Sequence, residues 1–105
     1  MMSARHITST DFEQQVLQAD RPTLVDFYAD WCGPCRAMGG LVDELAADSN
    51  LDANVVKVNV DESPDLATQY GVQSIPTFIV VKDGVASQRL VGVQSKEDLE
   101  AALAG

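Results

Sequence analysis

The chain has 105 residues, of which 46% are apolar, and its sixteen acidic and seven basic residues give a net charge of −9. This length suits one domain that buries a core without disulfide support, so we expect a single domain over residues 1–105. The negative charge, with no cluster of Lys or Arg, argues against a nucleic-acid partner. No apolar run has the length of a signal sequence or a membrane span, which predicts a cytoplasmic protein that does not bind membranes.

The first half of the chain alternates strand and helix patterns. Residues 5–8 form a short strand candidate, and Thr10 with Glu13 has the spacing of a capping box that opens an amphipathic helix. Residues 23–29 are an almost continuous apolar run, typical of a strand covered on both faces. Residues 35–49 then carry apolar side chains at helical spacing. This half therefore predicts two strand-helix units.

The next segments continue this alternation. Residues 54–60 form a second buried strand, and Ser63, followed by a proline, caps a helix that Gly71 stops. A third strand-helix unit is therefore expected here.

The chain ends with a predicted hairpin and helix. Residues 77–81 and 86–92 are its strands, because Asp83-Gly84 between them suits the two positive φ angles of a type I′ turn. Ser95 then caps a final helix. The whole order predicts an α/β fold with a central mixed β-sheet and helices on both faces, in which helical crossovers join parallel strands and the hairpin closes the sheet.

Both cysteines lie in the motif WCGPC, residues 31–35, at the carboxyl end of a predicted strand, where such sheets carry ligand chemistry. They are a structural disulfide, half of a metal site, or a redox couple. A bridge across so short a loop removes little chain entropy, which disfavours a structural role. Zinc needs four ligands, and the one histidine, His6, belongs to the first strand, so only sharing between chains would complete a site. We therefore expect no bound metal.

The WCGPC motif after a buried strand, Asp26 inside that strand and the later sequence Ile75-Pro76-Thr77 resemble the thioredoxin family over essentially the whole chain. The resemblance implies a thioredoxin fold and a protein-disulfide reductase that uses no cofactor. It also implies thioredoxin reductase and disulfide-containing proteins as partners, and we expect a monomer.

The two cysteines are expected to have different roles. Cys32 precedes the first helical turn, where free backbone N–H groups and the positive end of the helix dipole favour a thiolate, so it is the expected nucleophile. Gly33 and Pro34 let the backbone bring Cys35 back under Cys32, as the thiol that resolves a mixed disulfide with substrate. Neither intervening residue adds a charge that would stabilise the thiolate, which favours a reducing couple.

Asp26 is a carboxylate in the middle of a strand that is predicted to be buried. Desolvation is expensive for such a group unless it is neutral or paired. Lys57 occupies the same setting in the next strand, so one interpretation is a buried ion pair between the strands. The other follows from the resemblance, which implies that Asp26 relays protons to Cys35. Both interpretations remain open at this point, and both residues are candidates for the catalytic site.

The resemblance also implies a substrate-binding surface. It implies a cis peptide between Ile75 and Pro76, packed beside the cysteines, with the Ile75 backbone pairing to the substrate chain. An apolar patch would then surround Cys32. The expected substrate-binding residues are Trp31, Gly33, Pro34, Ile75, Pro76, Gly92 and Val93.

Two positions depart from the family pattern. Tyr28 stands where thioredoxins usually have tryptophan, and Gly40 where they usually have proline. Neither carries the thiol chemistry, so stability and substrate preference are the properties that they affect. The alternative function is a non-catalytic binding module that uses the same apolar patch within an assembly, and the intact CGPC sequence argues against it.

Overall fold

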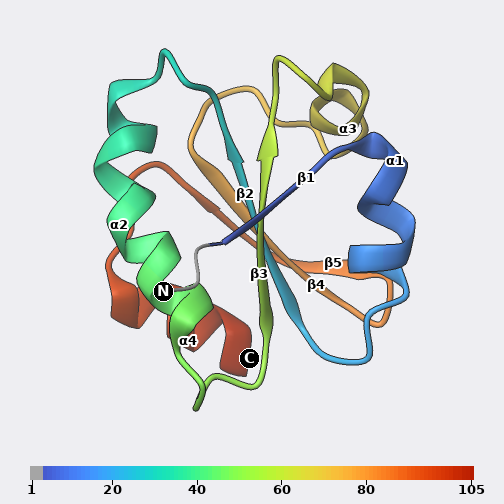
Figure 1. Cartoon of the computed structure of the whole chain (residues 1–105), viewed down its shortest axis with the longest axis vertical. Helices are drawn as coiled ribbons and strands as arrows, with labels where there is room; N and C mark the ends of the chain where they lie inside the picture. Colours follow the sequence, from blue (N-terminus) through green and yellow to red (C-terminus); the bar gives the residue numbers. More distant parts are fainter. Residues whose placement is uncertain (1–3) are drawn as a thin grey trace.

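The computed structural model describes residues 4–105. One sheet with the strand order β1-β3-β2-β4-β5 forms the centre (Figure 1). Its strands are β1 (Arg5–Ile7), β2 (Thr23–Tyr28), β3 (Asn54–Asn59), β4 (Thr77–Lys82) and β5 (Val85–Val91). The helices are α1 (Ser9–Phe12), continued by the π-helical turn η1 (Glu13–Leu17), then α2 (Gly33–Ala47), α3 (Pro64–Gln69) and α4 (Lys96–Ala104). The predicted fold class, a mixed sheet with helices on both faces, is confirmed.

The direction of β4 differs from the prediction. β1, β3 and β2 are parallel, but β4 runs antiparallel to β2, and β5 runs antiparallel to β4. The prediction that the helical crossovers join only parallel strands is therefore wrong for β4. The reason is that α3 and its flanking loops stay at the edge of the sheet where β3 ends and do not run back along the sheet (Figure 1). The chain thus enters β4 at the edge of the sheet where it left β3.

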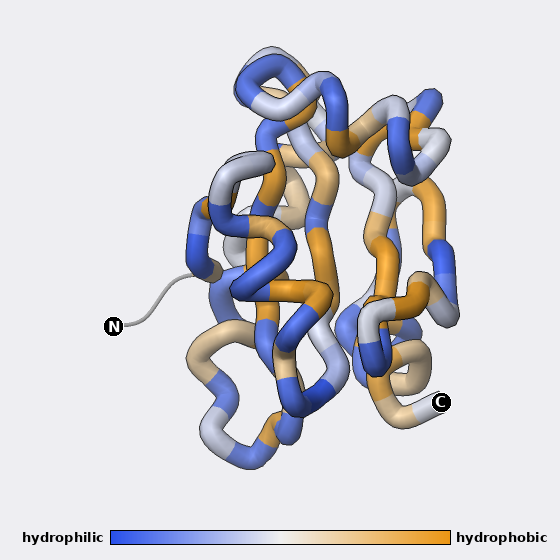
Figure 2. The backbone as a smooth tube through the Cα atoms, turned by 90° about the vertical axis from the view of Figure 1, so that its right-hand side faces the viewer, coloured by the Kyte–Doolittle hydropathy of each residue, from blue (hydrophilic) through white to orange (hydrophobic). Residues whose placement is uncertain are grey.

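The strands divide the apolar side chains into two cores. Alternate residues such as Leu24 and Phe78 pack with α2 and α4 on one face of the sheet. Val25 and Phe27 pack with α1, η1 and α3 on the other. The two pairs of helices lie to the left and right of the sheet in Figure 1, and Figure 2 shows hydrophobic residues along the central strands. Asp26 alternates with Val25 and Phe27, and therefore lies on the α2 side of the sheet.

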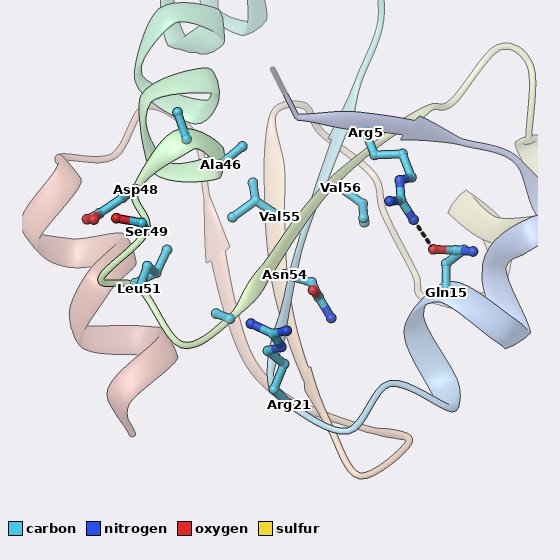
Figure 3. A pocket seen from close by; sticks show the side chains of 12 residues that line it. Arg5, Gln15, Arg21, Ala46, Asp48, Ser49, Leu51, Asn54, Val55 and Val56 are labelled. Atoms are coloured by element: carbon cyan, nitrogen blue, oxygen red, sulfur yellow. Dashed lines mark hydrogen bonds between the residues drawn. The ribbon is translucent and has the colours of Figure 1, made fainter. Parts of the chain in front are cut away.

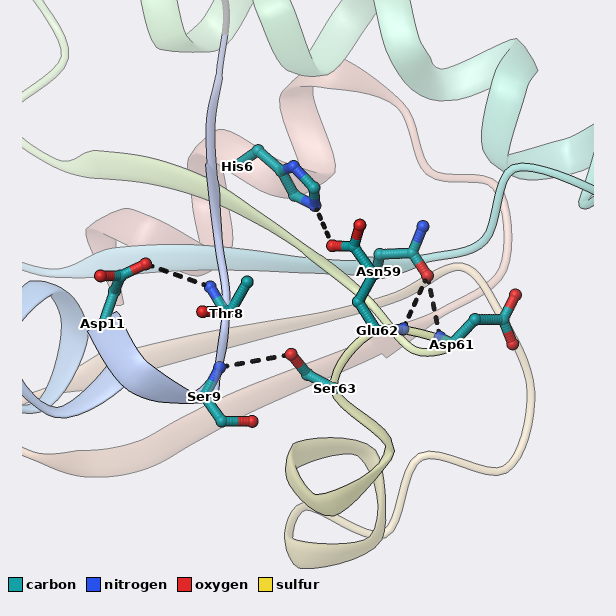
Figure 4. A network of polar contacts seen from close by, with 8 residues as sticks. All are labelled: His6, Thr8, Ser9, Asp11, Asn59, Asp61, Glu62 and Ser63. Atoms are coloured by element: carbon teal, nitrogen blue, oxygen red, sulfur yellow. Dashed lines mark hydrogen bonds and ion pairs between the residues drawn. The ribbon is translucent and has the colours of Figure 1, made fainter.

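The predicted helix starts hold with one exception. The first helix begins after Thr8 rather than Thr10, and the Thr8 backbone N–H donates to Asp11 Oδ2 at 3.4 Å (Figure 4). Strand β1 ends at Ile7, so the chain turns directly into the helix and the capping pair falls two residues earlier than expected. Ser95 Oγ accepts from the Asp98 backbone N–H at 3.0 Å, as its predicted capping role requires.

The predicted hairpin turn is confirmed. Asp83 and Gly84 have φ angles of 52° and 79°, the positive pair of a type I′ turn.

Candidate active site

The two cysteines open helix α2 directly after the end of β2. Cys32 is the residue before the first helical turn and has an extended backbone, and Pro34 occupies that turn, where no backbone N–H is needed. The Cys35 backbone N–H points at Cys32 Sγ, at an N to S distance of 3.2 Å. The cysteines form a disulfide, with Cα atoms 5.2 Å apart. The helix N-terminus therefore directs a hydrogen-bond donor at the Cys32 sulfur.

The segment before β4 packs against the disulfide. Ile75 contacts the cysteine cluster, and its carbonyl oxygen lies 3.7 Å from Cys32 Sγ. The Ile75–Pro76 peptide is cis, as expected. The Gly92 backbone N–H donates to the Pro76 carbonyl oxygen at 2.8 Å. Gly92 has a φ of 88°, which glycine adopts without strain, so the loop after β5 turns in beside Pro76.

Large apolar side chains are exposed around this buried disulfide. Trp31 is 69% exposed and Val93 63%, whereas each cysteine is only 5% exposed. Trp31 Nε1 donates to Asp61 Oδ2 at 2.8 Å, which fixes the direction of the indole ring. Asn59 Oδ1 in turn accepts the Asp61 backbone N–H at 2.8 Å (Figure 4). The structure thus places an anchored tryptophan directly before the cysteines.

Asn59 and Asp61 were not among the predicted site residues. A signal for them was available, because they lie at the carboxyl end of β3, the same edge of the sheet that carries Cys32. The side-chain partner of Asp61, Trp31, is thirty positions away in sequence. The sequence therefore predicts that Asn59 and Asp61 lie at the active-site edge of the sheet, but it does not predict the contact between Asp61 and Trp31.

Asp26 is 2% exposed in the middle of β2. Burial raises the pKa of this carboxyl group to about 7, while the positive charge of Lys57 lowers the pKa and the negative charge of Asp43 raises it further. The carboxyl oxygen Oδ1 accepts no hydrogen bond from the described part of the protein. A carboxyl group in this setting exchanges its proton near neutral pH.

Of the two interpretations of Asp26, the buried ion pair with Lys57 is wrong. The two residues are direct neighbours in the register of β2 and β3, but no ion pair between residues 4 and 105 joins them. Lys57 is half-buried rather than buried, and its Nζ lies 4.4 Å from the centroid of the Tyr28 ring. The strand register places Lys57 beside Asp26, but its charged end turns to an aromatic face instead.

Two hollows differ in their relation to the cysteines. One, of about 210 Å³, reaches Cys35 and is lined by Tyr28, Ala29, Asp30, Cys35, Arg36, Gly39 and Lys57. The other, of about 390 Å³, lies at the opposite end of β3, where Arg5 is hydrogen-bonded to Gln15 (Figure 3). It contains none of the predicted site residues. Of these two hollows, only the one that reaches Cys35 is therefore lined by predicted site residues.

The single histidine lies apart from the disulfide. His6 is exposed on β1, and its Nε2 lies 2.9 Å from Glu62 Oε1, away from the cysteines (Figure 4). Among residues 4–105, no three side chains of the His, Cys, Asp or Glu type come together as metal ligands. In the same range, no helix combines the length and apolar character that crossing a membrane would take.

A buried disulfide at a helix N-terminus, with an exposed apolar rim and a buried carboxyl group on the preceding strand, defines a thiol-disulfide oxidoreductase. The family model described as Thioredoxin matches residues 3–105. The chain is 46% identical over 103 residues to Thioredoxin 1 of Nostoc sp., covering 98% of this chain and 96% of that protein. It is 48% identical over 98 residues to the thioredoxin of Alicyclobacillus acidocaldarius, covering 93% and 92%. The chain belongs to the thioredoxin family, and it is a protein-disulfide reductase with Cys32 and Cys35 as its redox pair.

Proposed function

We propose that Cys32 is the nucleophile of the reduced protein and Cys35 the resolving thiol. The Cys32 thiolate attacks one sulfur of a substrate disulfide, forms a mixed disulfide and displaces the other substrate sulfur as a thiolate. The Cys35 thiolate then attacks Cys32 Sγ, closes the Cys32–Cys35 bond and releases the second substrate sulfur. Two electrons pass to the substrate. The observation that supports this order is the Cys35 N–H directed at Cys32 Sγ at 3.2 Å, a donor that favours negative charge on Cys32 alone.

We propose that Asp26 accepts the proton that Cys35 must lose before it can attack. A pKa of about 7 lets the carboxyl group take up and return a proton at neutral pH. Its place on the α2 face of the sheet, below the helix that carries Cys35, supports this role. Lys57, next to Asp26 in register, contributes the positive charge that favours the ionised form of the carboxyl group.

We propose that protein substrates dock on the exposed rim of the disulfide. The rim combines the anchored Trp31, the first turn of α2, the carbonyl of Ile75 and the loop after β5. A backbone segment beside Ile75 would bring a substrate sulfur toward Cys32, and the apolar side chains would contact the flanking residues. The proposed residues of the rim are Trp31, Gly33, Pro34, Ile75, Pro76, Gly92 and Val93.

The docking surface has a matched test. Val93 and Val85 are similarly exposed, at 63% and 64%, but Val85 lies at the far end of β5. A Val93→Asp substitution should raise KM for a protein disulfide by about tenfold and change kcat little, because it removes binding rather than chemistry. Val85→Asp should leave both unchanged. Equal effects of the two substitutions, measured by steady-state kinetics, would exclude a docking role for the rim.

We propose thioredoxin reductase as the electron donor and disulfide-containing proteins as the acceptors, on the basis of the family. We also propose that residues 1–105 act as a single-domain monomer in the cytoplasm. Reducing chemistry of this kind suits a compartment in which thiols are kept reduced. Equilibrium sedimentation of the reduced and oxidised protein tests the monomer.

The function is tested by catalytic turnover. With dithiothreitol present, the chain at micromolar concentration should accelerate reduction of the interchain disulfides of insulin, measured by the precipitation of the freed chain. Replacing both cysteines with serine should abolish the acceleration. A binding module would give stoichiometric association and no turnover, and that result would reject the proposal.

A further inference from the structure

The cavity beside Cys35 is bounded by a contact that the thiol chemistry does not require. Tyr28 ends β2, and Lys57 Nζ lies 4.4 Å from the centroid of its ring. Both side chains line the cavity that reaches Cys35. A ring face attracts an ammonium ion through its quadrupole, and the attraction strengthens where water is partly excluded. The Tyr28 ring therefore binds the Lys57 ammonium group in a defined position.

Asp26 is the competing partner for that charge. It is the register neighbour of Lys57, and residues 26, 28 and 57 project to the same face of the sheet. The flexible four-carbon side chain of Lys57 can therefore direct its ammonium group either to the Asp26 carboxylate or to the Tyr28 ring. In the structure the carboxylate has no ion pair with Lys57, and the ring holds the ammonium group.

We propose that Tyr28 is a positioning residue that holds the Lys57 ammonium group against its ring and thereby prevents a direct ion pair with Asp26. The inference rests on the proposed role of Asp26 as the proton acceptor for Cys35. With the ammonium group on the ring, its charge still acts on Asp26 from a distance, but burial dominates and the carboxyl group keeps a proton up to neutral pH. A direct ion pair would lower the pKa of Asp26 further, and the carboxylate would then be a weaker base for the Cys35 proton.

Other charged groups near this pair belong to several elements. Asp43 on α2 acts on Asp26 in the same direction as burial, whereas Asp30 and Arg36 line the cavity with opposite charges. The His6 ring on β1 stands edge-on to Tyr28, with ring centroids 6.0 Å apart. None of these groups takes the Lys57 charge in an ion pair within the described residues, so the ring and Asp26 remain the two alternatives.

The test is a direct titration of Asp26 in the oxidised protein, followed by the carboxyl ¹³C NMR signal. Tyr28→Leu removes the ring and should lower the midpoint by at least about one pH unit, since an opposite charge within 4–6 Å lowers a carboxyl pKa by roughly 1–3 units. Tyr28→Phe keeps the ring face and should leave the midpoint at its wild-type value. Tyr28→Met provides the same test as the leucine variant with an unbranched side chain. Near-UV circular dichroism checks that each variant is folded.

A double-mutant cycle separates positioning from simple hydration of the cavity. In a Lys57→Met background, Tyr28→Leu should no longer lower the midpoint, because no ammonium group is left to move. A shift of the same size in that background would mean that water entering the cavity causes it, and would overturn the proposal. So would a shift in Tyr28→Phe as large as in Tyr28→Leu.

The cycle also distinguishes this inference from the proposed catalytic role. The titration of the oxidised protein does not depend on turnover. If the midpoint moves as expected but the pH profile of insulin reduction does not follow it, the positioning role of Tyr28 stands and the role of Asp26 as proton acceptor fails.

Discussion

Asp26 links the stability of the protein to its chemistry. Its side chain is 2% exposed, and burial raises its pKa from 3.8 to about 7. The folded state therefore holds a proton between these two pH values that the unfolded chain has lost. Since the folded state binds more protons, the free energy of unfolding falls as the pH rises from about 4 to about 7, and it is level above that range. The carboxyl group thus destabilises the fold at neutral and alkaline pH.

Replacing Asp26 with alanine should remove this penalty. The pKa difference corresponds to a stability change on the order of 4 kcal/mol at pH 8, from which the loss of packed side-chain volume subtracts. At pH 4 only the packing loss remains, so Asp26→Ala should be stabilising at pH 8 relative to its effect at pH 4. Urea unfolding at both pH values measures the difference. A variant whose effect is the same at the two pH values would show that Asp26 titrates normally in the folded protein.

At the scale of elements, α2 combines an N-terminus that serves the chemistry with a middle that carries two adjacent glycines. Gly39 and Gly40 lie inside the helix, and a Cβ atom at either position would meet no atom within 4 Å apart from its chain neighbours and the backbone of the helix itself. Neither has a positive φ angle. Because glycine in a helix loses more backbone entropy on folding than alanine does, the helix is weakened at this point without a packing reason.

Gly39→Ala should therefore stabilise the protein by about 0.5–1 kcal/mol, a rise of several degrees in Tm for a domain of this size. Gly84→Ala is the matched control, because Gly84 has a φ of 79° in the hairpin turn, and it should lower Tm. Differential scanning calorimetry compares the two. A decrease in Tm for Gly39→Ala would mean that the helix needs glycine there for a reason other than space.

The elements that follow from local pattern were predictable, and those that depend on distant contacts were not. The apolar run of β2 and the Asp83-Gly84 turn depend on interactions within a few residues. The local sequence was therefore sufficient to predict both. The antiparallel direction of β4 depends on where α3 and its loops pack, which residue types do not encode directly.

The same limit applies to the site. The cysteine pair and the place of Asp26 beside Lys57 followed from the motif and the strands. The contact of Trp31 with Asp61 joins two loops, and the choice of Lys57 between Asp26 and Tyr28 is decided by side-chain geometry in the folded protein. Neither leaves a periodic pattern in the sequence.

At the scale of the whole molecule, the groups that stabilise or oppose a Cys32 thiolate set the direction of the redox reaction. The more a fold stabilises the reduced thiolate, the more oxidising its couple becomes. Here the helix N-terminus is the main support for a Cys32 thiolate, because the Arg36 side chain reaches the Asp30 carbonyl oxygen at 3.5 Å. The buried Asp26 opposes further negative charge nearby. The couple should therefore be strongly reducing.

Equilibration with glutathione buffers measures this direction. The protein should remain largely in the disulfide form at mildly oxidising ratios of reduced to oxidised glutathione, with a potential below those of glutaredoxins. Alkylation of free thiols followed by mass spectrometry gives the oxidised fraction. A couple that is already fully reduced at such a ratio would make the protein an oxidant.

The central claim, that Cys32 attacks and Cys35 resolves, is tested most directly by trapping the intermediate. Cys35→Ser and Cys32→Ser variants are each mixed, in the reduced form, with a disulfide-bonded protein substrate, and the products are identified by non-reducing mass spectrometry. Cys35→Ser should accumulate a mixed disulfide through Cys32, because attack survives and resolution does not. Cys32→Ser should form little adduct, since Cys35 lacks the helix N-terminal donor that points at Cys32 Sγ. Repeated turnover by Cys35→Ser, or faster adduct formation by Cys32→Ser, would contradict the assignment of the two sulfurs.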